Sequence, residues 1–124
     1  MPDLLRFSAE ILSALATREG RLKDRRHESS LFDANTVEIF SARQGPADSS
    51  RALGWDTPST PSSSGSLFAP RSIGHLGYTG TSLWMDRDRQ LAVVLLTNRT
   101  WPDRQNKAIQ SVRPAFHDAV GSSV

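Results

Sequence analysis

The chain contains no cysteine among its 124 residues. This absence excludes a disulfide framework and any chemistry that needs a thiolate. Long apolar runs are also missing, since no stretch approaches the roughly 18 apolar residues of a membrane-spanning helix. Residues 1–6 lack the basic-then-apolar order of a secretory signal. We therefore expect no membrane span in this chain, and the sequence leaves its cellular location undetermined.

Lysine is scarce, because Lys23 and Lys107 are the only two among 15 basic residues. The 13 acidic residues are scattered among the arginines, so the net charge is only +2 although the isoelectric point is near 9.7. This mixture does not form the one-sided basic patch that nucleic-acid binding needs, and we expect no nucleic-acid partner. The three histidines, His27, His75 and His117, are dispersed, so we predict no metal site and no cofactor.

Two helices are expected in the first third of the chain. Apolar residues at helical spacing predict one over residues 4–18, which ends before Gly20. A polar loop is expected over residues 21–30. Asp33 is a candidate N-cap for a second helix that ends near residues 45–46.

A short strand carrying a buried Trp55 is expected over residues 51–56. The Ser- and Pro-rich residues 57–66 that follow cannot build a core, and their composition is that of a linker. Because only about 55 residues follow, we interpret residues 57–66 as a long solvated loop within one fold, with no domain boundary.

Residues 73–99 are the most informative stretch. They read as a strand, a charged turn at 86–89 that we expect to be solvated, and an apolar strand at 91–96. The uninterrupted apolar run predicts a central strand covered on both faces. Glycines at 74, 77 and 80 weaken the first strand, which suggests that a ligand approaches its backbone closely.

A last helix is expected from residue 101, with a kink or restart at Pro114. His117 is interpreted as a surface residue. Taken together, the elements predict an α+β fold of the α/β sandwich type: an antiparallel sheet of about three strands flanked by N- and C-terminal helices.

Residues 72–86, followed by 91–99, closely resemble the C-terminal third of the serine β-lactamase-related hydrolases. This family comprises class C β-lactamases, D-alanyl-D-alanine carboxypeptidases and esterases that share the penicillin-binding fold. The resemblance continues through 53–55, 101–102 and 112–120. It implies that residues 1–124 are the C-terminal portion of such a hydrolase domain, with a partial β-lactamase/transpeptidase-like fold.

The family carries a Lys/His-Thr/Ser-Gly motif on the edge strand of its cleft, and His75-Leu76-Gly77 matches it here. Leu76 departs from the pattern, which has a hydroxyl at this position to bind the substrate carboxylate. The backbone N–H that follows, here that of Tyr78, would be one oxyanion-hole donor, typically worth about 3 kcal/mol. The resemblance therefore implies that His75, Gly77 and Tyr78 line a cleft for a small-molecule or peptidoglycan-type substrate.

The family's other two motifs are absent. Neither Lys23 nor Lys107 has a serine three residues earlier, so there is no Ser-x-x-Lys. Tyr78, the only tyrosine, is followed two residues later by glycine, so Tyr-x-Asn is missing too. No Ser-x-Asn or Gly-x-Ser-x-Gly replaces them. No complete catalytic set is present, and the family places the missing motifs before this stretch. We therefore expect a fragment that lacks an N-terminal portion and is inactive by itself.

An alternative interpretation is a non-catalytic module that binds a ligand or docks on another chain to complete a sheet. The apolar strand at 91–96 motivates it, because the chain offers few elements to cover both faces and both edges of such a strand.

Overall fold

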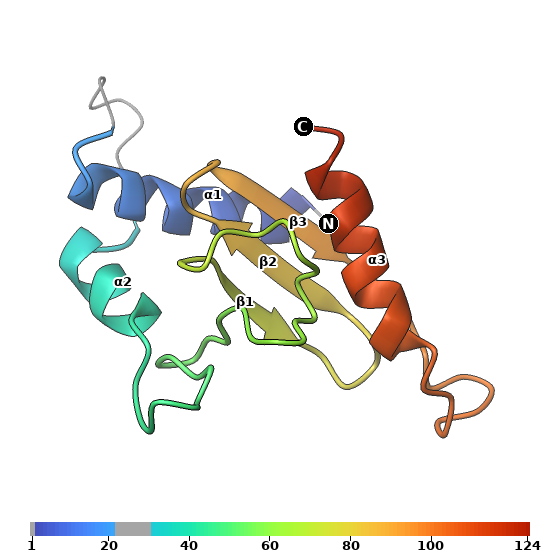
Figure 1. Ribbon diagram of the computed structural model, residues 1–124. Coiled ribbons are helices and arrows are strands. Elements are labelled where there is room, and N and C mark those ends of the chain that lie inside the picture. Colours follow the sequence, from blue (N-terminus) through green and yellow to red (C-terminus); the bar gives the residue numbers. More distant parts are fainter. Residues whose placement is uncertain (1, 22–30) are drawn as a thin grey trace.

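The computed structural model describes residues 2–21 and 31–124. The chain forms three helices and a three-stranded antiparallel sheet, in which β2 lies between β1 and β3 (Figure 1). The elements are, in order, α1 (Pro2–Arg18), α2 (Ala34–Ser41), β1 (Ile73–Leu76), β2 (Ser82–Asp86), β3 (Leu91–Leu95) and α3 (Ile109–Gly121). The α+β prediction is confirmed. Residues 22–30, which include most of the expected polar loop and His27, lie outside the described residues.

Helix α1 forms where the sequence predicts it. Its inner face buries Ile11, Leu12 and Leu15, and full burial of one such leucine stabilises the fold by about 1.5–3 kcal/mol. Gly20 ends the helix with a positive φ of 67°. Its N–H donates to the Thr17 carbonyl while the Arg21 N–H reaches back to the Ala16 carbonyl, which is the Schellman arrangement.

Helix α2 begins as predicted, because the Asp33 side chain accepts a hydrogen bond of 2.8 Å from the Thr36 N–H. The predicted end near residues 45–46 is wrong, since the helix stops at Ser41. Ala42 already has extended backbone angles, and the Phe40 carbonyl accepts from the Leu53 N–H of a distant loop. A tertiary contact therefore ends this helix early.

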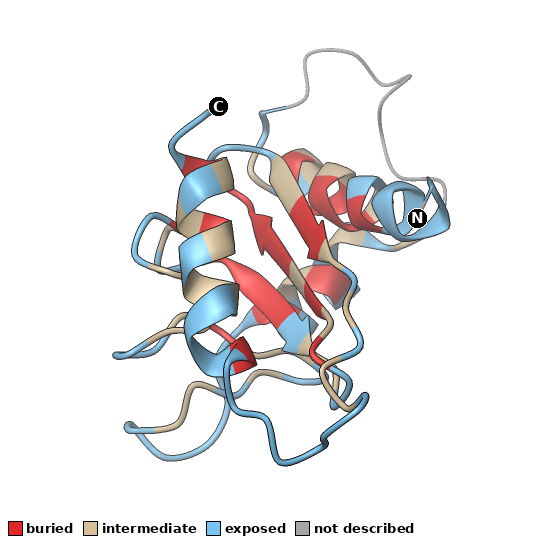
Figure 2. Cartoon of the chain, turned by 90° about the vertical axis from the view of Figure 1, so that its right-hand side faces the viewer, coloured by how far each residue is buried: buried red, intermediate tan, exposed pale blue. Residues whose placement is uncertain are grey.

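Helices α1 and α3 cover opposite faces of the sheet (Figures 1 and 2). Met85 and Ile73, which are paired across β1 and β2, face α1 and join its core. Trp84 faces the other way and packs with Phe68, Val93 and residues of α3. This alternation follows from the period-two geometry of strands and buries residues on both sides of β2.

The strand expected at 91–96 is present, but the prediction that it is central in the sheet is wrong. Strand β3 lies at the edge of the sheet and pairs with β2 alone within the described part of the chain. Its apolar run is explained by cover on both faces instead, since Val93 faces the α3 side and Val94 the α1 side. Sheet order depends on contacts that an apolar run does not encode.

Gly74 has an intramolecular explanation rather than the predicted ligand. It lies opposite Trp84 in the pairing of β1 with β2, and a Cβ at this position would overlap the indole ring. Gly77 is similarly crowded by the Thr81 side chain, while Gly80 has a φ of 99° that favours glycine. The approach that the glycines permit is therefore made by the chain's own side chains.

The charged turn at 86–89 is solvated as predicted only in its second half, where Asp88 and Arg89 are exposed. The prediction is wrong for its first half, since Asp86 is 0% and Arg87 3% exposed. The Asp86 carboxylate accepts hydrogen bonds from the Asp88 and Arg89 N–H groups, which closes the turn. Arg87 Nη2 lies 2.6 Å from Glu19 Oε1 and 2.5 Å from Glu38 Oε2. Charges can enter the interior because each finds a partner there.

Two predictions in the flanking segments are also corrected. Residues 51–56 form isolated bridges, including one between Asp56 and Gly74, rather than a strand, and Trp55 is half-buried. Helix α3 starts at Ile109 instead of residue 101, because Asp103 and Asn106 accept hydrogen bonds from nearby backbone N–H groups in turns that compete with a helix. The helix then continues through Pro114 without a restart.

The loop at 57–66 contains no helix or strand, yet it is not simply solvated. Ser64 is fully buried, and the Ser66 N–H donates to Asp118 Oδ1 on α3 at 2.6 Å. The loop thereby covers part of that helix. In the described segments, no helix is long and apolar enough to cross a membrane.

Candidate functional site

The turn at residues 77–81 joins β1 to β2 and carries two of the three predicted cleft residues. It is closed by hydrogen bonds from the Gly77 N–H to the Thr81 carbonyl (2.9 Å) and from the Gly80 N–H to the Gly77 carbonyl (3.1 Å). The Arg99 N–H donates to the Thr79 carbonyl at 2.8 Å, which ties the turn to the segment after β3. The turn therefore has a fixed shape although it lies at the surface.

Arg113 of α3 fixes the turn from the other side. Its Nη2 donates to the Gly77 carbonyl at 2.7 Å and to the Thr81 carbonyl at 2.9 Å, and its Nε donates to the Gly80 carbonyl at 3.1 Å. Burial, together with the nearby Arg99 charge, lowers the pKa of the Arg113 guanidinium. Sequence reasoning missed this residue. Its position four residues after Ile109, on the buried side of the helix, was the available signal.

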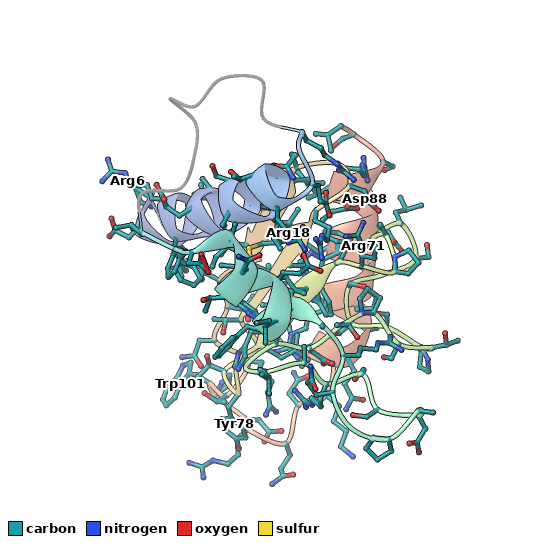
Figure 3. All side chains as sticks on the ribbon, turned by 90° about the vertical axis from the view of Figure 1, so that its left-hand side faces the viewer. Arg6, Arg18, Arg71, Tyr78, Asp88 and Trp101 are labelled. Atoms are coloured by element: carbon teal, nitrogen blue, oxygen red, sulfur yellow. The ribbon has the colours of Figure 1, made fainter. Side chains whose placement is uncertain are left out.

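Tyr78 is 70% exposed, and the Arg99 side chain contacts both its backbone and its ring. The Arg99 Nε donates to the Tyr78 carbonyl at 2.9 Å, and the guanidinium carbon lies 4.7 Å from the centre of the Tyr78 ring, a cation–π contact. No described residue accepts a hydrogen bond from the Tyr78 N–H. This donor is thus positioned and available. Figure 3 shows Tyr78 and Trp101 at one end of the molecule, with Arg71 and Asp88 at the other.

The structure does not bring the three predicted residues into one hollow. His75 is exposed and, with Gly77, lines a hollow of about 380 Å³ that also includes Leu4 and Val94. Tyr78 and Gly77 line a second hollow of about 400 Å³ on the side of Arg99 and α3. Gly77 alone is common to both. Leu76, at the position where the resembling family has a hydroxyl, packs against the apolar cluster of Phe68, Trp84 and Val93.

A family model described as beta-lactamase matches residues 1–114. The chain belongs to the beta-lactamase family. The resemblance inferred from the hairpin at 73–99 is therefore confirmed.

Curated relatives with similar sequences are named as D-alanyl-D-alanine carboxypeptidases. The protein from Salmonella paratyphi B is 39% identical over 72 residues, and that from Salmonella gallinarum is 40% identical over 73. Each alignment covers 56% of this chain and 16% of the relative, so the chain spans only a small part of their length.

A solved structure shares the fold. A beta-lactamase from Mycobacterium bovis superposes with a TM-score of 0.68 at 23% sequence identity, covering 98% of this chain and 43% of that protein. At this identity the comparison concerns the fold alone.

A serine–histidine pair lies inside this beta-lactamase-family chain, between the first residue of β2, which directly follows the turn at 77–81, and helix α3. Ser82 Oγ and His117 Nε2 are 2.9 Å apart, and both side chains are buried. Burial, followed by the Arg113 charge, lowers the pKa of His117 to about 4, partly offset by Asp118. The expectation of a surface His117 is wrong, because position 117 continues the buried side of α3 from Ile109 and Arg113. Because Ser82 is only 3% exposed and His117 0%, we interpret the pair as structural.

Within residues 2–21 and 31–124, no group of three or more histidine, cysteine, aspartate or glutamate side chains could hold a metal ion.

Proposed function

We propose that residues 1–124 form the C-terminal portion of a β-lactamase-related serine hydrolase domain and contribute one wall of its substrate cleft. The observation that carries this proposal is the family match over residues 1–114, combined with a turn at 77–81 that is rigid yet exposed. Coverage of 43% of the Mycobacterium bovis beta-lactamase agrees with a chain that supplies part of such a domain.

In this proposal, His75, Gly77 and Tyr78 are the substrate-facing residues. The Tyr78 N–H supports the role of oxyanion-hole donor, because it has no acceptor among the described residues and its position is fixed by Arg99. A preorganised donor of this kind stabilises the charge that develops on a tetrahedral intermediate, typically by about 3 kcal/mol. The hydroxyl that the family has at position 76 is replaced by a core leucine, so this wall binds a substrate carboxylate more weakly.

The isolated chain should not hydrolyse substrates. It contains no Ser-x-x-Lys, and its Ser82–His117 pair is buried. A nucleophilic serine needs both an activating base and access to the substrate. In the larger domain the nucleophile would come from outside this chain.

Unpartnered apolar surface supports a larger domain. Strand β3 presents the run Leu91–Leu95 at the sheet edge, an arrangement that favours pairing with a further strand. A hollow of about 250 Å³ between α1, α2 and Trp55 is lined almost entirely by apolar side chains. Large apolar residues are exposed around these two helices: Leu4, Leu5, Phe7, Ile39, Phe40 and Leu53. Further elements that pack on them would remove this surface from water.

The names of the relatives support one substrate class for the proposal. The relatives are named as D-alanyl-D-alanine carboxypeptidases, and this name favours a peptidoglycan-type peptide as the substrate. We propose this substrate class for the complete domain. A β-lactam or a short ester remains the competing substrate within the same acyl-enzyme chemistry.

The isolated chain can be tested directly. It is incubated with a chromogenic cephalosporin, a short-chain nitrophenyl ester and a D-alanyl-D-alanine peptide, and we expect no turnover above buffer. The matched control is Ser82→Ala, which removes the serine that pairs with His117. Turnover that survives a mock purification would contradict the proposal of an inactive chain, and its loss in Ser82→Ala would assign it to the buried pair.

A chimera tests the cleft wall itself. The segment of this chain that aligns with the Salmonella paratyphi B protein replaces its counterpart there, and peptide cleavage is measured. We expect activity to be retained at a reduced level and to increase in the Leu76→Thr variant, which restores the family's hydroxyl. A folded chimera without activity in either form would refute the proposed wall.

The alternative function is a non-catalytic module whose β3 edge completes the sheet of another chain. The unpaired apolar edge is the observation that favours it. A monomer that unfolds cooperatively and binds no hydrolase partner would support an independent module. A product that aggregates or lacks fixed tertiary structure would favour the incomplete hydrolase domain.

A further inference from the structure

The hollow beside the turn at 77–81 concentrates positive charge. Its volume is about 400 Å³, within the usual range for small-molecule sites. We name it the cationic pocket after its four basic lining residues, Arg99, Arg104, Lys107 and Arg113. No acidic side chain lines it. Asp103, the acidic residue nearest in sequence, caps the Gln105 N–H instead.

None of these four cations forms an ion pair within the described part of the chain. The ion pairs found there all lie at the other end of the sheet, where Arg21, Arg71 and Arg87 meet three carboxylates. Carboxylates therefore neutralise arginines at one end of the sheet, whereas no carboxylate of the described residues neutralises the four cations of the cationic pocket.

Two of the three guanidiniums are fixed in place by neutral acceptors. Arg113 donates to three carbonyls of the turn, and Arg99 donates to the carbonyls of Tyr78, Arg104 and Asn106. These bonds use Nε and one terminal nitrogen of each side chain. The remaining terminal nitrogen of each, Arg99 Nη2 and Arg113 Nη1, has no acceptor among the described residues. Fixed guanidiniums with free donors bind oxyanions with little loss of side-chain entropy.

The charge state indicates the kind of ligand. Arg99 and Arg113 are close enough for the first to disfavour protonation of the second, so their repulsion is not compensated by the protein. A single carboxylate would neutralise one of four positive charges. A phosphate or diphosphate carries two or more and offers several oxygens for charge-assisted hydrogen bonds.

We propose that the cationic pocket is a binding site for a phosphate or diphosphate group. This inference is independent of hydrolysis and of the missing nucleophile, because it needs only residues of this chain. Either a soluble phosphorylated molecule or a phospholipid headgroup could present the group.

The probe is inorganic pyrophosphate, titrated into the full chain at low ionic strength while amide resonances are followed. We expect a Kd on the order of 1 mM or tighter, with the largest shifts at the backbone of residues 77–78 and 107–110. Acetate at matched ionic strength is the carboxylate control and should bind at least about tenfold more weakly, since it lacks the second charge.

The decisive variant is Arg104→Gln combined with Lys107→Gln. Both side chains are exposed and have no partner in the described segments, so the fold should be retained. We expect pyrophosphate affinity to fall about tenfold, the loss expected for charge-assisted hydrogen bonds, while Arg6→Gln, at an exposed site on α1, leaves it unchanged. An unchanged affinity in the double variant, binding of acetate as tight as pyrophosphate, or no binding at all would overturn the proposal.

Vesicles distinguish the two sources. Binding to phosphatidate-containing vesicles that pyrophosphate competes away, without binding to pure phosphatidylcholine, assigns the pocket to a lipid headgroup. Pyrophosphate binding without vesicle binding assigns it to a soluble phosphorylated ligand. Either result supports the site.

Discussion

The two ends of the sheet use arginine in opposite ways. At the turn between β2 and β3, Arg87 is buried against Glu19 and Glu38, and Arg21 and Arg71 complete what we call the paired cluster. At the turn between β1 and β2, the hydrogen bonds of the Arg99 and Arg113 side chains go to backbone carbonyls, and neither side chain meets a carboxylate among the described residues. Figure 3 places Arg71 and Asp88 of the first end far from Tyr78 of the second.

This difference separates stability from binding. A buried arginine with carboxylate partners is part of the interior and leaves no charge for a ligand. Arginines that are held by carbonyls keep their full charge, which is unfavourable for the protein alone and favourable for an anion. The same residue type therefore has a structural role at one end and a proposed binding role at the other.

The largest loss of stability is expected when a mutation disrupts the paired cluster. Arg87→Ala should lower the free energy of unfolding by about 3 kcal/mol, because it removes the buried guanidinium that joins Glu19 to Glu38. Glu19 keeps Arg21 and Arg71, so the loss falls mainly on Glu38 and on the interior that Arg87 fills. Urea denaturation measures this change. Arg6→Ala, at an exposed site, should stay within about 0.5 kcal/mol of the parent chain. Equal midpoints for the two variants would refute a structural role for the paired cluster.

Acid should destabilise the fold by protonating His117, whose imidazole is buried and neutral in the native chain. Burial lowers the pKa of His117 to about 4, below its ordinary value of 6.5. Between these values the unfolded state binds more protons, so this contribution is fully present above pH 6.5 and is lost as the pH falls towards 4. We expect a loss of roughly 2 kcal/mol between pH 7 and about pH 4.5.

Thermal unfolding across this pH range measures the effect of His117. The His117→Gln variant can still hydrogen-bond Ser82 and should lose most of the slope, whereas the exposed His75→Gln variant should keep it. Glu38, whose pKa is lowered by the Arg87 hydrogen bond, adds a loss only as the pH falls below its ordinary value of 4.5. A slope that persists in His117→Gln would assign the acid sensitivity elsewhere.

A smaller effect is expected when the turn at 77–81 loses its support. Arg113→Met removes three hydrogen bonds to carbonyls that water can replace, and it also removes an uncompensated charge. We expect a destabilisation of about 1 kcal/mol and faster hydrogen exchange at the Gly77 and Gly80 amides. Arg104→Met is the matched control and should leave both amides unchanged. Protection that survives in Arg113→Met would show that the turn does not depend on this side chain.

Salt should produce the smallest effect and should distinguish the two clusters. Added sodium chloride screens the repulsion within the cationic pocket, so Tm should rise by roughly 1 °C. The rise should shrink in the Arg104→Gln/Lys107→Gln variant, which has less repulsion to screen. The same increment in both chains would contradict an uncompensated pocket.

The sequence predicted correctly those features that depend on residues close together in the chain. The Asp33 cap, the end of α1 at Gly20 and the type of each strand in the hairpin depend on residues close in sequence, and all three were predicted. The errors fall where a distant residue decides. The Phe40 carbonyl accepts from the Leu53 N–H, β3 pairs with β2 alone among the described residues, and His117 is buried against Phe68 and Ser82.

The candidate site divides in the same way. His75, Gly77 and Tyr78 could be named from one short motif, but their distribution over two hollows required the register of β1 with β2. The roles of Arg99 and Arg113 could not be predicted, because a sequence does not indicate which arginines meet carboxylates and which meet carbonyls.

The sequence by itself determined the family, the fold class and the absence of a nucleophile motif, since these depend on residue identity and local spacing. Only the tertiary structure decided which charges are neutralised. Coulomb interactions and burial act between residues far apart in the chain, and they pair Arg87 with Glu19 and Glu38 while leaving Arg99 and Arg113 available to an anion.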